Sequence, residues 1–207
     1  MGARQGRTAA EWCSYLLEPK NWLIVTVAGV GWHADGLAGA GWGLLAALFV
    51  AVLPAVFIWQ GVRRGRWADR NVGARRPRLI VLGFITASVA AGLTLLIAAG
   101  APRVLTGYLA FMLASVALLA LVTLVWKISI HCAVASGSVA ILCLSYGPLL
   151  LPGYLLVALL GWSRVAMADH TAAQAAVGAL LGAASAVLAY AVIVRGMQPA
   201  SNLHGSK

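Results

Sequence analysis

The sequence predicts an all-α protein, a polytopic membrane bundle of six or seven helices. Of its 207 residues, 62% are hydrophobic, whereas the apolar share of soluble globular domains is roughly 45–50%. The mean hydropathy is +0.91. The apolar residues are gathered into runs separated by short polar stretches, a pattern typical of several membrane helices in one domain.

The N-terminal part contains two apolar runs. Residues 1–21 are polar and are expected to form a tail or an interfacial helix. The first run, 22–34, is shorter than the roughly 20 residues of a full span, so it either crosses by borrowing flanking residues or is re-entrant. The second run, 37–60, is a predicted span despite Pro54, because membrane helices tolerate proline. An Arg-rich loop follows at 61–78.

Five further apolar runs follow this loop. They are two spans at 79–100 and 104–126, a tight hairpin of shorter runs at 132–147 and 149–162, and a last span at 171–194. The last span carries small residues at helical spacing, including Gly178 and Gly182, which let membrane helices approach closely. We therefore expect a single transmembrane domain over 22–195 and a polar tail over 196–207.

Three polar stretches, at 61–78, 127–131 and 163–170, are expected on the same side of the membrane. Two apolar runs separate each stretch from the next, and an even number of crossings returns the chain to the side it left. Lys and Arg favour the cytosolic side. The sequence therefore predicts a multi-pass integral membrane protein whose active face lies in the cytosol.

The composition also limits the partners. The net charge is +10, and seven Arg lie between positions 63 and 78, which suggests contact with anionic membrane lipids or a phosphorylated substrate. Nucleic-acid binding is not expected, because no soluble domain carries the charge. Cys13, Cys132 and Cys143 form no Cys-x-x-Cys pair, and no carboxylate cluster is present to hold Mg²⁺, so neither a disulfide framework nor a metal or other cofactor is predicted. The oligomeric state stays open.

The third polar stretch carries residues suited to phosphate chemistry. Arg164 and His170 are six positions apart. Arg offers a planar fork of donors that matches phosphate oxygens, and a neutral His can attack phosphorus or move a proton near pH 7. Ionisable groups at membrane depth are usually functional, although His170 could instead be only the first residue of a helix at the membrane interface.

The segment from Ser163 to Gln174 resembles the third motif of the type 2 phosphatidic acid phosphatase superfamily, which includes membrane lipid phosphatases and prenyl-diphosphate phosphatases. That motif is Ser-Arg, five residues, His, three residues, Asp. Ser163, Arg164 and His170 match it, and Gln174 stands at the Asp position.

Two earlier segments resemble the other motifs of the same superfamily, in the same order. The second motif, Pro-Ser-Gly-His, corresponds to Ile-Ser-Ile-His with Ser129 and His131. The first motif, Lys, six residues, Arg-Pro, corresponds to Arg76-Pro77, with Asp69 at the Lys position. The resemblance covers residues 60–180 and implies the helical membrane fold of that superfamily.

The resemblance implies a role for each matched position. His170 would be the nucleophile that forms a phosphohistidine, and His131 would be the general acid. The phosphate-binding residues would be Arg164, Arg76 and Ser129, with Lys127, Arg70 or Arg75 in place of the missing Lys. No metal is implied, because cationic side chains neutralise the phosphate charge.

Gln174 is the departure with the clearest consequence. It lies one helical turn after His170, on the same face. Its amide can accept a hydrogen bond from one ring nitrogen and fix the tautomer, as the superfamily's Asp does. It cannot supply a negative charge, so we expect the phosphohistidine to form more slowly.

The predicted function is therefore metal-independent hydrolysis of a phosphate or diphosphate ester on a prenyl or glycerolipid substrate. Two alternatives use the same scaffold. One is a non-hydrolytic prenyl-diphosphate enzyme, a transferase or cyclase, because such chemistry needs no nucleophile. The other is an inactive protein that binds lipid phosphates.

Overall fold

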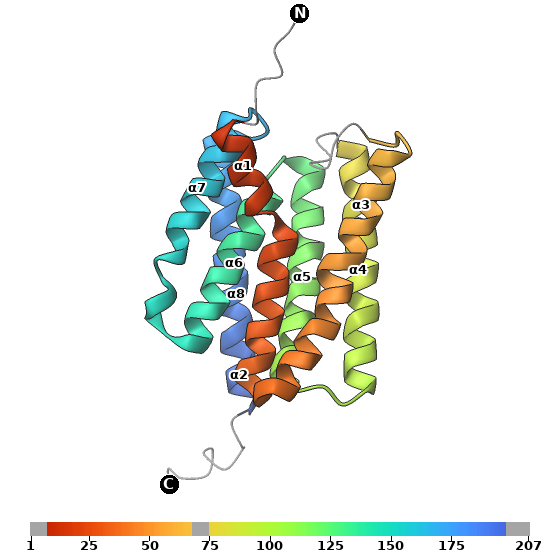
Figure 1. Cartoon of the computed structure of the whole chain (residues 1–207), viewed down its shortest axis with the longest axis vertical. Coiled ribbons are helices and arrows are strands. Elements are labelled where there is room, and N and C mark those ends of the chain that lie inside the picture. Colours follow the sequence, from red (N-terminus) through yellow and green to blue (C-terminus); the bar gives the residue numbers. More distant parts are fainter. Residues whose placement is uncertain (1–7, 68–74, 198–207) are drawn as a thin grey trace, which may run out of the picture.

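The structure is a computed structural model that describes residues 8–67 and 75–197, and these residues form only helices, turns and loops. The predicted all-α class is confirmed. The helices lie side by side in one bundle (Figure 1). In chain order they are α1 (Ala9–Leu16), α2 (Pro19–Ala47), the π-helix η1 (Leu48–Val52), α3 (Leu53–Arg63), α4 (Arg75–Ala98), α5 (Arg103–Val125), α6 (Ile130–Tyr146), the 3₁₀-helix η2 (Pro148–Leu150), α7 (Gly153–Ala166) and α8 (Ala172–Met197).

Much of the described chain is suited to a membrane. Five helical stretches are long and apolar enough to cross one, and α6 is a shorter apolar helix. The five stretches are Ala9–Arg63, Arg76–Ala98, Arg103–Val125, Pro148–Ala166 and Ala172–Ile193. Large apolar side chains such as Leu121, Leu155 and Leu180 stay exposed on the outside of the bundle. This is the arrangement expected where hydrocarbon surrounds the helices.

The first of these stretches folds back on itself within α2. The chain leaves helical geometry at Asp35–Gly36, where the glycine adopts a φ of 53° that favours glycine. A Cβ added to Gly31 would overlap the backbone of Gly39, and one added to Gly43 would overlap the backbone of Val27. Both pairs are symmetric about residue 35, so two antiparallel arms meet there. The short first apolar run is therefore one arm of a helical hairpin.

The predicted span 37–60 contains a π-helical segment. Leu53 donates its backbone N–H to the carbonyl of Leu48, one residue further back than in an α-helix. Pro54 has no N–H to donate, so the Phe49 carbonyl cannot receive the next π-helical hydrogen bond from that position. Ser88 Oγ of α4 donates to that carbonyl at 2.6 Å. The wide turn is therefore held by a neighbouring helix.

The Arg-rich loop is shorter than predicted. The helix before it, α3, runs to Arg63, and α4 begins at Arg75, so positions 75–78 are helical. Pro77 is compatible with this start, because the first N–H groups of a helix have no intrahelical acceptor. Asp69 and Arg70 lie outside the described residues.

Helices α6 and α8 approach each other closely. A Cβ added to Gly178 would overlap the carbonyl oxygen of Ser129, and one added to Gly182 would overlap that of Ala133. The prediction that these glycines form a close helix contact is confirmed. The contact brings the start of α6 against the first turns of α8.

The described parts of the three polar stretches lie at the same end of the bundle as α1 (Figure 1). The hairpin of α6, η2 and α7 returns the chain to this end, as predicted for 132–162. Hydrogen bonds join the described parts of these stretches. Arg78 Nη1 donates to the Ile128 carbonyl at 3.4 Å, and Lys127 Nζ donates to the Asp169 carbonyl at 2.6 Å. We call this end of the molecule the polar end.

Candidate functional site

The loop between α7 and α8 directs His170 inward. The backbone N–H groups of Asp169 and His170 both donate to the Arg164 carbonyl, at 3.1 and 3.2 Å. Ala168 has a φ of 56°, a left-handed conformation that turns the chain back after α7. His170 is 7% exposed as a result.

Gln174 orients the His170 ring as predicted. Its Oε1 lies 3.2 Å from His170 Nδ1 and also accepts the Thr171 N–H at 3.2 Å. Thr171 Oγ1 in turn accepts the Gln174 N–H at 3.3 Å, so the two residues form a reciprocal cap at the start of α8. Because Oε1 is an acceptor, Nδ1 carries the ring proton when His170 is neutral. The lone pair on Nε2 is then available to a ligand.

Arg164 ties three segments together. It is 1% exposed, its Nη2 lies 2.8 Å from Asp169 Oδ2, and its Nη1 donates to Ser14 Oγ of α1 at 2.7 Å. Lys127 Nζ in turn donates a hydrogen bond to the backbone carbonyl of Asp169. The structure thus brings Arg164 and Lys127 close together, as predicted. In the structure both side chains bond to Asp169, whereas the prediction gave both a phosphate to bind.

Ser129 has a structural role in this arrangement. Its Oγ accepts the Cys132 N–H at 3.4 Å and caps α6, and its own N–H donates to the Gln174 carbonyl at 3.2 Å. The residue is fully buried and is not part of the cavity wall. The predicted phosphate-binding role of Ser129 therefore has no geometric support, whereas a role in joining α6 to α8 has.

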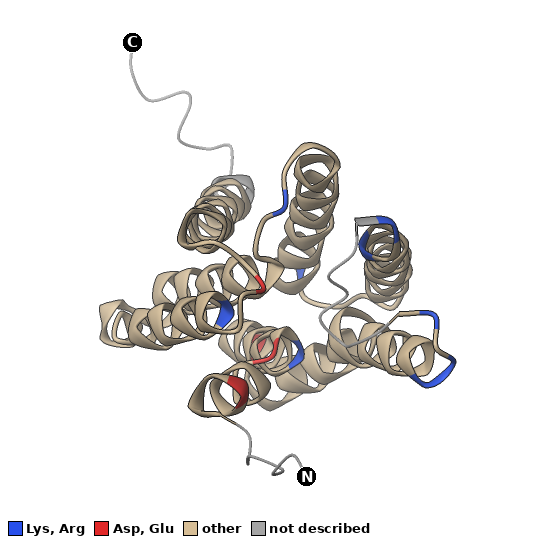
Figure 2. Cartoon of the chain, turned by 90° about the horizontal axis from the view of Figure 1, so that it is seen from above, with Lys and Arg blue, Asp and Glu red and all other residues tan. Residues whose placement is uncertain are grey.

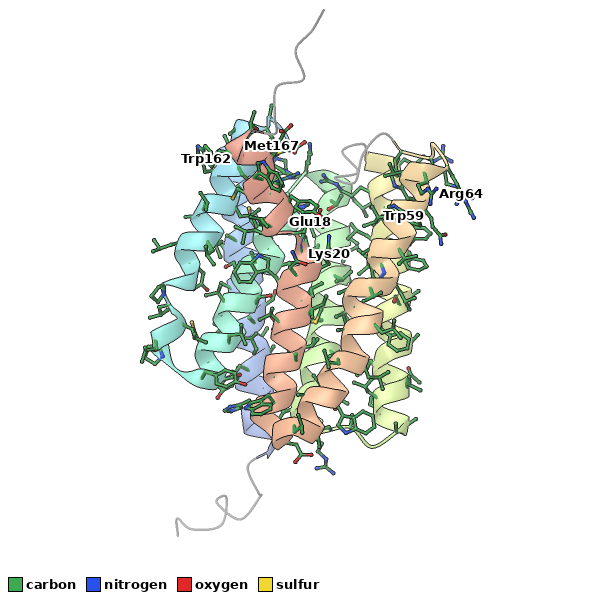
Figure 3. The ribbon with its side chains drawn as sticks, viewed as in Figure 1. Glu18, Lys20, Trp59, Arg64, Trp162 and Met167 are labelled. Atoms are coloured by element: carbon green, nitrogen blue, oxygen red, sulfur yellow. The ribbon has the colours of Figure 1, made fainter. Side chains whose placement is uncertain are left out.

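A cavity of about 480 Å³ opens beside His170. Its polar wall consists of Glu18, Lys20, Arg78, His131 and His170, and Glu18 and Lys20 form an ion pair. The rest of the wall is largely apolar and comes from α2, η1, α3, α4, α5 and α6. The first arm of α2 and helix α3 flank it, with Glu18, Lys20 and Trp59 toward the polar end (Figure 3). Such a cavity suits a ligand with an anionic head and an apolar body.

Arg78 lies at the cavity, whereas the resemblance points to Arg76. Arg78 is 6% exposed and lines the cavity, whereas Arg76 is exposed and does not. Two positions on a helix differ by about 200° in direction, so only one of these residues can face inward. Arg78 shares its face with Leu82, Ile85 and Val89, which also line the cavity. That apolar periodicity is the signal that could have identified it.

Of the remaining predicted positions that the structure describes, His131 lines the cavity and Lys127 does not. The side chain of Arg75 lies outside the described residues, as does Arg70. His131 is half-buried and shares the cavity wall with His170. The described residues contain no group of three His, Cys, Asp or Glu side chains able to hold a metal.

The positive charges around His170 favour its neutral form. Burial, together with the charges of Lys127, Arg78 and Arg164, lowers the pKa of His170 from 6.5 to about 4, although the hydrogen bond to Gln174 acts in the opposite direction. Seen from the polar end, Lys and Arg positions lie on several separate helices (Figure 2). His170 is therefore neutral near pH 7 and sits in a field that attracts anions.

The comparisons with known proteins add no relative. No protein-family model, no curated protein and no solved structure matches this chain.

Proposed function

We propose that this protein is a multi-pass membrane enzyme that hydrolyses a phosphate or diphosphate ester of a prenyl or glycerolipid substrate at a cytosolic polar end. The observation that carries the proposal is the cavity: Arg78, His131 and His170 stand at one end of a wall that is otherwise largely apolar. A lipid phosphate has the same division between a charged head and an apolar body. The short motifs around Arg164 and His170 support the same reaction class.

The chemistry needs only residues at the polar end. His170 Nε2 attacks phosphorus, the bond from phosphorus to the lipid oxygen breaks, and His131 donates a proton to that oxygen. Water then attacks the phosphohistidine and gives a proton to His131, which releases inorganic phosphate and restores both histidines. Arg78 balances the phosphate charge from the cavity wall, and Arg164 adds a second buried cation behind the His170 loop.

One observation favours a second candidate function, binding or non-hydrolytic transfer of a prenyl diphosphate. The group on His170 Nδ1 is the neutral amide of Gln174, which cannot stabilise an imidazolium as a carboxylate does. In addition, the Asp169 carboxylate holds Arg164. If the wild type releases no phosphate and Gln174→Asp does, this second candidate is the native function.

The direct test is phosphate release from prenyl and glycerolipid phosphates, with a chelator present and no added metal. Arg78→Gln is expected to reduce kcat/KM by about 10²–10³-fold, the usual effect of removing one group that stabilises the transition state. Arg76→Gln, on the same helical turn but exposed, is the matched control and should stay within about twofold of the wild type. An equal loss of kcat/KM in both variants would show that Arg78 does not act in the site.

The pH profile gives a further prediction. Attack requires neutral His170, and its pKa of about 4 places the acid limb of kcat/KM near pH 4 instead of near 6.5. Activity should therefore persist as the pH falls from 7 to 5. Gln174→Asp places a carboxylate beside Nδ1, which raises the pKa of His170 and moves the acid limb upward. An acid limb that stays in place in Gln174→Asp would show that it does not report His170.

A further inference from the structure

The cavity has a defined end on the side away from the polar end. We call this end the floor, and the π-helix η1 forms it. The π-helix η1 supplies Val50, Ala51 and Val52 to the cavity wall. Val50 and Ala51 are each 2% exposed. The floor is fixed from behind, because Ser88 of α4 bonds the Phe49 carbonyl and a Cβ on Gly92 of α4 would overlap the Phe49 side chain.

The distance from the polar end to this floor can be read along α4. Arg78 and Val89 both line the cavity and are eleven positions apart, which corresponds to about 16 Å of helix. An extended hydrocarbon chain advances about 1.25 Å per carbon for bonds of about 1.5 Å at tetrahedral angles. The apolar wall is therefore as long as about 13 carbons.

The volume gives a similar size. At about 30 Å³ for each water-sized group, a cavity of 480 Å³ holds about 16 groups the size of a methylene. A single chain with its phosphate at Arg78 accounts for this space. A lipid with two such chains needs about twice as much.

We propose that the cavity takes a lipid phosphate with a single chain of about 12–15 carbons, and that Ala51 and Met112 set the accepted chain length. This inference rests on the proposed function for the identity of the head group. Ala51 stands in the floor. Met112 of α5 lines both this cavity and a neighbouring one of about 80 Å³, so its side chain lies where the two spaces adjoin.

The two residues predict changes in opposite directions. Ala51→Phe fills the floor with about six additional carbons and should shorten the longest well-bound chain by about four to six carbons. Met112→Ala opens the neighbouring space, which at about 30 Å³ per group adds room for about three carbons or more. A loss of general stability cannot produce opposite shifts.

The experiment is calorimetric titration of n-alkylphosphonates of 8 to 18 carbons into the full chain in nanodiscs. Phosphonates keep an uncleavable carbon–phosphorus bond, so binding is measured whether or not the protein is an enzyme. At 14 carbons, Ala51→Phe is expected to bind at least tenfold more weakly than the wild type. Leu48→Phe adds the same ring on the exposed side of η1, where Leu48 is 40% exposed and not part of the cavity wall, and should leave the profile unchanged.

Several results would overturn the inference. One is an affinity that does not change with chain length in any variant. That result would mean that the tail lies in the bilayer and not in the cavity. Another is a phosphatidic acid with two 14-carbon chains that competes as well as the single-chain phosphonate. If Ala51→Phe does not fold, Met112→Ala is the deciding variant, and an unchanged longest chain there contradicts the proposed limit on chain length. Phosphonate binding that shifts as expected without phosphate release would remove the hydrolase proposal and leave the tail site in place.

Discussion

His170→Ala is expected to abolish phosphate release, with a loss of about 10⁴-fold or more in kcat. The expected loss is this large because, in the proposed reaction, the variant removes the atom that attacks phosphorus, and the cations of the site cannot replace it. The measurement is release of phosphate under single-turnover conditions. In parallel, acid-labile phosphate should be trapped on the wild-type protein and be absent from His170→Ala.

His33→Ala is the matched control for the loss of a histidine. His33 is exposed in the first arm of α2 and its ring lies edge-on to Tyr146, 5.1 Å between centroids. It is not part of the cavity wall, so this variant should retain full activity. A His170→Ala protein that still forms acid-labile phosphate would place the nucleophile elsewhere and end the present assignment.

Gly182→Val is expected to be the most damaging of the packing variants. Its side chain would meet the backbone carbonyl of Ala133, which cannot turn away as a side-chain tip can. Over-packing usually costs about 1–3 kcal/mol, and this contact should reach at least the upper value because backbone has to move. The thermal midpoint in detergent should fall accordingly, and activity should fall with it, since α6 carries His131 and α8 carries Gln174, which orients His170.

Gly83→Val provides the comparison for this substitution. Gly83 is an exposed glycine of α4, and a Cβ there meets nothing within 4 Å. The same change of residue type should leave the thermal midpoint within a few degrees of the wild type. Equal destabilisation by both variants would mean that valine disfavours these helices generally and that the α6–α8 contact is not specially tight.

Local spacing predicted the parts of the site that lie within one helical turn. Gln174 was expected to reach His170 from the next turn, and the hydrogen bond is present at 3.2 Å. The glycine pair of α8 was expected to allow a close helix contact, and it does. In both cases the separation is fixed by the helix itself, so a sequence pattern is enough.

The sequence did not predict those features of the site that depend on the phase of a helix or on contacts between residues far apart in the chain. The motif resemblance favours Arg76, but α4 begins early enough to turn Arg78 inward instead. The partner of Arg164 in α1 is Ser14, 150 positions away, and no local pattern marks it. The ion pair between Asp169 and Arg164 forms because the loop turns back through Ala168, and spacing along a helix does not indicate that turn.

The α2 hairpin has a consequence for the order in which the molecule can assemble. Its arms join Gly31 to Gly39 and Val27 to Gly43, so little loop entropy is lost when it closes. The bonds at the polar end join residues much further apart in the chain, 42 positions between Lys127 and Asp169 and 150 between Ser14 and Arg164. Synthesis proceeds from the N-terminus, so the hairpin can close before α4 exists, while the site is complete only after the first turn of α8. The ribosome therefore delivers the α2 part of the cavity wall first and His170 among the last parts of the site.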